Sequence, residues 1–450
     1  IRDPEGTLHW WLQLGRFGLV FLKKVLPFGT DIHVVLINSM TYFLLAATVL
    51  LICYIIQRNS DNLSAKRLLL ASALFITAPV ILEQTNFILQ SFEVMLAFHL
   101  ITIACLFILT FFEQRRYSYL LIALLLSFFS FSIYPSLVVG YVALSLMVCF
   151  FYHDELKKRR TRYLTRLGMF ALICVGSFGL YLFVNKLVLF FSDLDIAPYL
   201  GAYSVYGHLS GEALTNFMID SFWADFSPTS PFALFFFLLL LLLFFLKLLL
   251  KNESSLIKLF TVVGVVFSAG LTFFVMGHLG PIRSLFPAYP ILLFFFAVYI
   301  TQSNTKKMNP FFTYLVLGIV LIQAHTTINF GLAEEQQFKQ EVQLTQEIHE
   351  HLNRKGLTDY PSYQLAVVGT RSFDVKSKGE VLGKSVFEWD AEINVGTSHR
   401  TGDFLYTQGL TFQRVTPEAY QTALAQSATM PSFPEEGSIQ IVGQLVILKF

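Results

Sequence analysis

The sequence predicts an α-helical polytopic membrane protein that carries a small α/β domain after its last membrane helix. The 450 residues are 55% hydrophobic, 16% aromatic and 14% charged, and the mean hydropathy is +0.60. Soluble globular proteins carry about 25% charged residues. This composition excludes an ordinary soluble enzyme, a disordered chain and a nucleic-acid binder, and the net charge of +2 gives no strong field for polyanions.

Ten apolar stretches are long enough, or nearly so, to cross a bilayer, which takes about 20 helical residues. They lie near residues 32–56, 67–83, 89–112, 117–133, 136–152, 167–190, 232–250, 259–277, 285–301 and 310–329. The clearest is 232–250. Two short ones, 117–133 and 136–152, are separated only by Tyr134-Pro135, and a re-entrant pair is the other reading of them.

The basic residues of the connecting loops alternate between the two ends of these stretches. One alternate set of loops holds Arg58, Lys66, Arg67, Arg115, Arg116, Lys157, Lys158, Arg159, Arg160, Arg162, Arg166, Lys251, Lys258, Lys306 and Lys307. The other inter-helix loops hold only Arg283. Because basic loops stay in the cytoplasm, we expect residues 1–31, the loop 191–231 and the tail 331–450 to lie outside.

The external segments differ in character. The chain opens at Ile1, and an external start implies a cleaved leader or, more simply, one further transmembrane helix upstream. Residues 7–26 mix tryptophans with Lys23 and Lys24, which predicts a juxtamembrane helix, either in the interface plane or simply packed there. In the tail, 334–355 reads as helix, and 364–370 and 438–450 as strands. We expect a small domain that covers or shapes a site.

The external loop 191–231 carries residues suited to binding sugars. It has four Asp, one Glu and no Lys or Arg, beside several tyrosines and Trp223. Carboxylates bind sugar hydroxyls, while aromatic rings cover the apolar sugar face. Glycosyl transfer needs a carboxylate to take a proton from the acceptor hydroxyl, and cations near a leaving phosphate. Arg283 is the first candidate for that phosphate, with Lys186, Arg16, Lys23 and Lys24 in reserve.

Each of these residues also has a purely structural reading. Asp193 and Asp195 are either a metal or sugar-phosphate site or a solvated loop start, and they leave open whether Mg²⁺ or Mn²⁺ takes part. Arg283 could pair with a lipid headgroup, and Lys186 could reach out to the interface. His278, in the same loop as Arg283, is a further candidate for substrate binding.

The residues Phe222-Trp223-Ala224-Asp225 resemble the Phe-Trp-Ala-Glu-Asp motif in an external loop of the Gtr-type glucosyltransferases that decorate bacterial O-antigen. Asp225 stands where that motif has Glu, and Phe226 where it has Asp. Two other parts are similar to this family. They are Trp11 with Arg16-Phe17-Gly18, and a tail with segments 385–390 and 430–439 that resembles Gram-positive members with an external domain.

The resemblance implies a fold of the GT-C class, an external active site and a sugar donor carried on a polyprenyl phosphate. Such enzymes place a catalytic acid in the first external loop, a position that maps to Asp3 and Glu5 or to residues upstream. We therefore expect a glycosyltransferase of the bacterial cytoplasmic membrane that moves glucose, or a similar hexose, to a surface polysaccharide or teichoic acid. Its partners would be the lipid-linked sugar, the polysaccharide and membrane lipid.

The expected roles follow from this reading. Asp3, Glu5 or Asp225 would serve as the catalytic carboxylate. The expected substrate-binding residues are Phe222, Trp223, Asp193, Asp195, Arg283, Arg16, Lys186 and His278.

Two other classes of function compete with this reading. A transporter or lipid flippase for cell-envelope precursors would place ionisable residues at mid-membrane, where this sequence has almost none. A sensor or scaffold, with the tail as its binding module, predicts no clustering of acid, aromatic and basic residues outside. The acidic, Tyr-rich loop 191–231 argues against it.

Overall fold

The computed structural model describes residues 4–26, 33–58, 63–153, 160–197, 205–206, 208–227, 230, 232–250, 255–277, 282–302, 308–375, 385–391 and 394–450. The chain divides into two compact units, one of residues up to Thr327 and one of Ile328–Phe450. The first unit is helical, and the second combines helices with a sheet.

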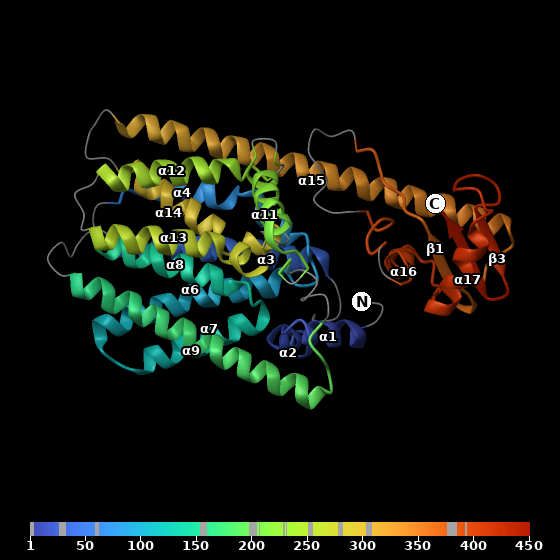
Figure 1. Cartoon of the computed structure of the whole chain (residues 1–450), viewed down its shortest axis with the longest axis horizontal. Helices are drawn as coiled ribbons and strands as arrows, with labels where there is room; N and C mark the ends of the chain where they lie inside the picture. Colours follow the sequence, from blue (N-terminus) through green and yellow to red (C-terminus); the bar gives the residue numbers. More distant parts are fainter. Residues whose placement is uncertain are drawn as a thin grey trace. The chain divides into compact units, whose positions relative to one another are not determined.

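The helices of the first unit follow the apolar stretches of the sequence (Figure 1). They are α1 (Pro4–Gln13), α2 (Phe17–Val25), α3 (Val34–Arg58), α4 (Ala65–Ile76), α5 (Pro79–Thr85), α6 (Ser91–Gln114), α7 (Ser118–Ile133), α8 (Leu137–His153), α9 (Arg160–Ser192), α11 (Gly211–Phe226), α12 (Phe235–Leu250), α13 (Ser255–Met276), η2 (Ile282–Leu285), α14 (Tyr289–Thr301) and the start of α15 (Met308–Arg354). Each of the ten predicted stretches overlaps one of these helices or, near 67–83, the pair α4 and α5.

Among the residues that the structure describes, five helices are long and apolar enough to cross a membrane, namely α3, α6, α9, α13 and α15. The pair α4–α5, bent by 52°, would make a sixth, whereas α7, α8, α12 and α14 are shorter apolar helices. These are the helices of a membrane protein. The number of ten spans stays a prediction, because four of the segments are shorter than a straight crossing requires.

The break between α4 and α5 is held by the last apolar helix. Pro79 begins α5, and a proline cannot donate the backbone hydrogen bond that would continue α4. The hydroxyl of Thr327 donates to the carbonyl of Thr77 at 3.1 Å, and the Thr77 hydroxyl donates to Oε1 of Gln323 at 3.3 Å. Side chains of α15 therefore satisfy the polar groups that the break leaves inside an apolar bundle.

Helices α3 and α6 run parallel, as their polar contacts show. The contacts join Thr41 to Ser91, Thr48 to His99, and Arg58 to Glu113. Since the residue numbers rise together along both helices, the chain must return to its starting side between them, and α4 with α5 makes that return. The exposed Arg58–Glu113 ion pair marks one end of the bundle, and the contacts of α6's first turn mark the other.

The N-terminal segment forms two helices where the sequence predicted one interface helix over 7–26. Gly15, at a φ of +75°, turns the chain between α1 and α2, and a Cβ there would lie 2.4 Å from the Tyr181 hydroxyl. Helix α2 is largely buried. Lys23 does not reach the interface: its ammonium lies 2.7 Å from Glu93 of α6, with both side chains at most 3% exposed. Lys24, one residue on, is exposed.

The predicted loop 191–231 contains a helix, α11, over Gly211–Phe226. The Phe-Trp-Ala-Asp residues form its last turn. Figure 1 shows α1, α2 and α11 at the same end of the first unit, the right-hand end in that view. These elements carry Glu5, Arg16, Phe222, Trp223 and Asp225 of the predicted site residues.

The second unit is built around a four-stranded mixed sheet of order β2-β1-β4-β3, in which only β3 and β4 pair antiparallel. Its elements are the end of α15, η3 (Tyr360–Ser362), β1 (Gln364–Val368), α16 (Ser398–Thr407), β2 (Gln413–Arg414), α17 (Pro417–Ser427), β3 (Ile439–Val442) and β4 (Leu445–Lys449). Alternate residues of β1 enter different cores, since Leu365 and Val367 pack with α15 while Ala366 packs with α17. The two segments predicted as strands contain β1, β3 and β4.

The buried Lys23–Glu93 pair should be essential for docking α2 onto α6. Replacing Lys23 with Met leaves the Glu93 carboxylate buried without a counter-charge, which costs about 3–5 kcal/mol. Thermal unfolding in detergent should show a lower Tm, whereas the exposed neighbour Lys24→Met should change stability by only about 0.5 kcal/mol. The double variant Lys23→Met/Glu93→Leu should regain most of the loss. Equal effects of Lys23→Met and Lys24→Met would contradict a stabilising role for the pair.

Candidate functional site

The predicted acidic residues lie in several places. Asp3 and His278 fall outside the described residues. Glu5 is exposed in the first turn of α1. Asp193 and Asp195 are exposed just after α9, Asp193 with a φ of +53°, and Lys186 is exposed within α9. No contact in the structure joins these four exposed residues to one another within the part of the chain that is described.

Helix α11 presents its motif residues on different faces. Phe222 packs on Phe226 with ring centroids 4.7 Å apart, whereas Trp223 is 61% exposed. Asp225 is half-buried and lies close enough to Tyr289 of α14 for an electrostatic interaction. The motif therefore places one carboxylate at the edge of the bundle and one aromatic ring on its surface.

Phe226, which stands where the related motif has an acid, is a core residue. It is 3% exposed, and its ring lies 6.2 Å from Tyr289 and 6.3 Å from Phe237. A carboxylate at this position would be buried among rings without a hydrogen-bond donor, which is costly. The departure from the motif therefore matches the local packing.

Arg283 lies on η2 and faces α5. Its guanidinium is 4.5 Å from the ring centroid of Phe87, and it interacts electrostatically with Glu83. Both partners belong to the end of α5 and the turn that follows it. Arg283 is thus held between an aromatic face and a carboxylate, an arrangement that fixes a guanidinium while leaving it able to bind an anion.

Arg16, the N-cap of α2, contacts the same turn between α5 and α6. Its guanidinium donates to Oε1 of Gln90 and lies 5.0 Å from the ring centroid of Tyr134. One turn further along α6, Glu93 binds Lys23, whose ammonium also lies 5.9 Å from the ring of Trp11.

Residues 83–93, which we call segment 83–93, therefore gather three cationic side chains. Arg283 approaches Glu83 and Phe87, Arg16 binds Gln90, and Lys23 binds Glu93. Cations fixed by neighbouring groups in a poorly solvated place can stabilise a phosphate that leaves with negative charge. This cluster is the candidate site, and Asp225 of α11, which interacts with Tyr289, is the candidate carboxylate.

The sequence identified the cations but not their partners. Glu83, Gln90 and Glu93 were not predicted as site residues, although the two glutamates flank an external turn in the predicted topology. Gln90 carries no sequence signal, because its role depends on the docking of α2 some seventy residues away.

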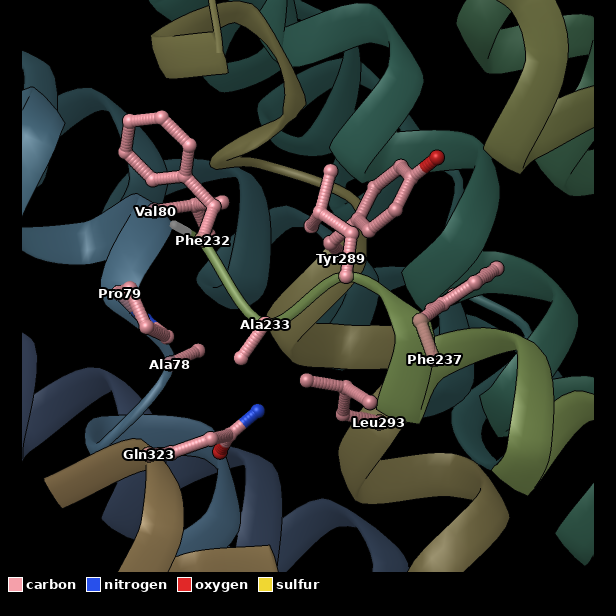
Figure 2. A pocket seen from close by; sticks show the side chains of 10 residues that line it. Ala78, Pro79, Val80, Phe232, Ala233, Phe237, Tyr289, Leu293 and Gln323 are labelled. Atoms are coloured by element: carbon pink, nitrogen blue, oxygen red, sulfur yellow. The ribbon is translucent and has the colours of Figure 1, made fainter. Parts of the chain in front are cut away.

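A small pocket lies beside the candidate site (Figure 2). Val80, Ala233, Tyr289, Leu293 and Gln323 are among the residues around it, and Tyr289 contacts the end of α11. Its volume of about 10 Å³ has room for about one water molecule and none for a sugar. The pocket therefore marks where α5, α12, α14 and α15 meet, and it is not itself a substrate site.

The described residues contain no group of three or more His, Cys, Asp or Glu side chains placed to hold a metal ion. The fold is that of a helical membrane protein, and the cluster is a candidate site for an anionic group. Residues 1–301 match the family model described as glucosyl transferase GtrII, and the chain belongs to that family. It is therefore a glycosyltransferase. No curated protein and no solved structure matches the chain.

Gly140 allows the segment that carries Arg283 to approach α8. A Cβ at Gly140 would lie 2.6 Å from Cβ and 2.7 Å from the carbonyl oxygen of Pro287. Gly140→Ala should therefore lower the Tm, by the equivalent of about 1–3 kcal/mol, and reduce glucosyl transfer as Arg283 shifts. Gly168→Ala is the matched control, because a Cβ there meets nothing within 4 Å. If both variants behave alike, the close approach at Pro287 has no role.

Proposed function

We propose that the protein transfers glucose, or a similar hexose, from a polyprenyl-phosphate donor to a cell-surface polysaccharide or teichoic acid on the outer face of the bacterial cytoplasmic membrane. The observation that carries the proposal is the cluster at segment 83–93, where Arg283 and Arg16 are held beside carboxylate and amide side chains. The family match supports glucose as the sugar.

In the proposed reaction, an acceptor hydroxyl oxygen attacks the anomeric carbon of the donor sugar. The bond from that carbon to the phosphate oxygen breaks, and polyprenyl phosphate leaves with the electron pair. Asp225 takes the proton of the acceptor hydroxyl, a role for which Glu5 and Asp3 are the other candidates. Arg283 and Arg16 stabilise the charge that develops on the phosphate.

The surroundings of the cluster suit a lipid-linked donor. Long apolar helices such as α3 and α6 end beside it, so a polyprenyl chain can stay in the bilayer while its phosphate reaches Arg283. Trp223 is the exposed ring nearest to Asp225 in sequence and is the proposed contact for a sugar face. The second unit, on the outer side in the predicted topology, would cover the site or guide the polymer.

Asp225→Asn tests the proposed base. The purified protein receives polyprenyl-phosphate-linked radiolabelled glucose with wall polysaccharide, and label in the polymer is measured. Because a general base contributes about 10²–10⁴-fold, transfer should fall by that factor at unchanged Tm. Asp220→Asn, an exposed position on the same helix, should leave the rate unchanged. Full activity in Asp225→Asn would remove this residue from the mechanism.

Arg283→Met tests the proposed phosphate contact. Loss of a preorganised cation should lower kcat/KM for the donor about 100-fold or more, and Arg283→Lys should restore part of it. Polyprenyl phosphate without sugar should also inhibit the variant more weakly than it inhibits the unsubstituted protein. The exposed Arg116→Met serves as control. Unchanged inhibition by polyprenyl phosphate would mean that Arg283 does not bind it.

A further inference from the structure

The side chain of Gln84 is buried without a hydrogen-bond partner. It lies on α5 within segment 83–93 and is 0% exposed. Neither its Nε2 nor its Oε1 has a hydrogen-bond partner within the part of the chain that is described. Buried amides are nearly always paired, because an unpaired one costs free energy that the fold must recover elsewhere. An unpaired buried amide therefore needs an explanation, and a bound ligand that pairs with it is one.

Gln84 stands among the groups already assigned to the site. Its neighbour Glu83 interacts with Arg283. Val80, four residues earlier and thus on the same face of α5, lines the small pocket with Tyr289 (Figure 2), and Tyr289 interacts with Asp225. Helix α5 thus connects the proposed phosphate contact with the proposed base.

Segment 83–93 holds a second polar atom of this kind. Oε1 of Glu93 binds Lys23, whereas Oε2 is buried without a partner among the described residues. The unpaired atoms of Gln84 and Glu93 lie on one short segment, beside cations that are themselves held in place. A ligand with several hydroxyl groups would satisfy such atoms.

The hydrogen-bonding groups of the Gln84 amide indicate which part of the donor it binds, the phosphate or the sugar. Phosphate oxygens only accept hydrogen bonds and would satisfy Nε2 alone. Two neighbouring hydroxyls of a sugar can accept from Nε2 and donate to Oε1 together. We propose that Gln84 binds two adjacent hydroxyls of the hexosyl group of the donor and so sets the enzyme's sugar specificity, an inference that rests on the proposed function.

The test combines stability with donor specificity. Transfer is measured from polyprenyl-phosphate-glucose and from its monodeoxy analogues, one for each hydroxyl, by the unsubstituted protein and by Gln84→Met. Met keeps the length of Gln without its polar atoms. Because Met removes an unpaired amide from an apolar place, the Tm should stay equal or rise while kcat/KM for glucose falls about 10- to 100-fold.

The specificity pattern is the decisive readout. The unsubstituted protein should discriminate about tenfold or more against two adjacent deoxy positions, and Gln84→Met should discriminate less than about twofold at those two. Gln426→Met is the matched control, because Gln426 on α17 also carries an unpaired buried amide oxygen among the described residues. It should leave the specificity pattern unchanged.

Each outcome decides the inference. A specificity pattern that is the same in Gln84→Met and the unsubstituted protein overturns it, and the amide is then only a buried structural group. If Gln84→Met does not fold, Gln84→Asn, which keeps the amide but shortens its reach, should lose the same two preferences, and full retention overturns the inference. If the unsubstituted protein uses no polyprenyl-phosphate hexose at all, the proposed function itself fails and the inference falls with it.

Discussion

The constraint on which the rest of this structure depends is that charged and polar groups inside an apolar helix bundle need partners. Segment 83–93 supplies partners for three cationic side chains of α2 and η2, namely Arg16, Lys23 and Arg283. A lysine buried as deeply as Lys23 would be too costly without Glu93. The positions of α2 and η2 are therefore linked to the same eleven residues, and these elements cannot move far without exposing a charge to hydrocarbon.

The helices on either side make this segment rigid. Pro79 separates α5 from α4, and Thr77 at the break is bonded to Gln323 and Thr327 of α15. At the other end, Gln90 caps α6, whose contacts with α3 continue along its length. Catalysis by electrostatic stabilisation requires groups that are already in position when charge develops. A short segment joined to fixed helices at both ends provides that preorganisation, while a mobile loop would have to reorganise at a cost.

Some of this architecture could be predicted from sequence and some could not. Apolar runs predicted the positions of the membrane helices, because about 20 apolar residues satisfy their backbone only as a helix in lipid. The sidedness of Arg283 stays a prediction from the alternation of basic loops. The pairing of Lys23 with Glu93 could not be predicted, since a long lysine side chain reaches either water or a buried carboxylate depending on how α2 docks. The sequence left open whether the helix over 7–26 lies in the interface plane or packs against the protein, and the buried Lys23 agrees with packing.

The single acid of the Phe-Trp-Ala-Asp motif can be understood from helix geometry. In α11, Phe222 and Phe226 are four residues apart and share the face that packs in the bundle. Trp223 is exposed on one flank of that face, and the half-buried Asp225 lies on the opposite flank. A second acid at position 226 would share the direction of Phe222, toward Tyr289 and Phe237, and not that of Asp225. In this chain the position serves to anchor the helix. The ring of Phe226 fixes the last turn of α11 and with it the place of Asp225, so the residue that replaces the acid contributes to positioning the remaining one.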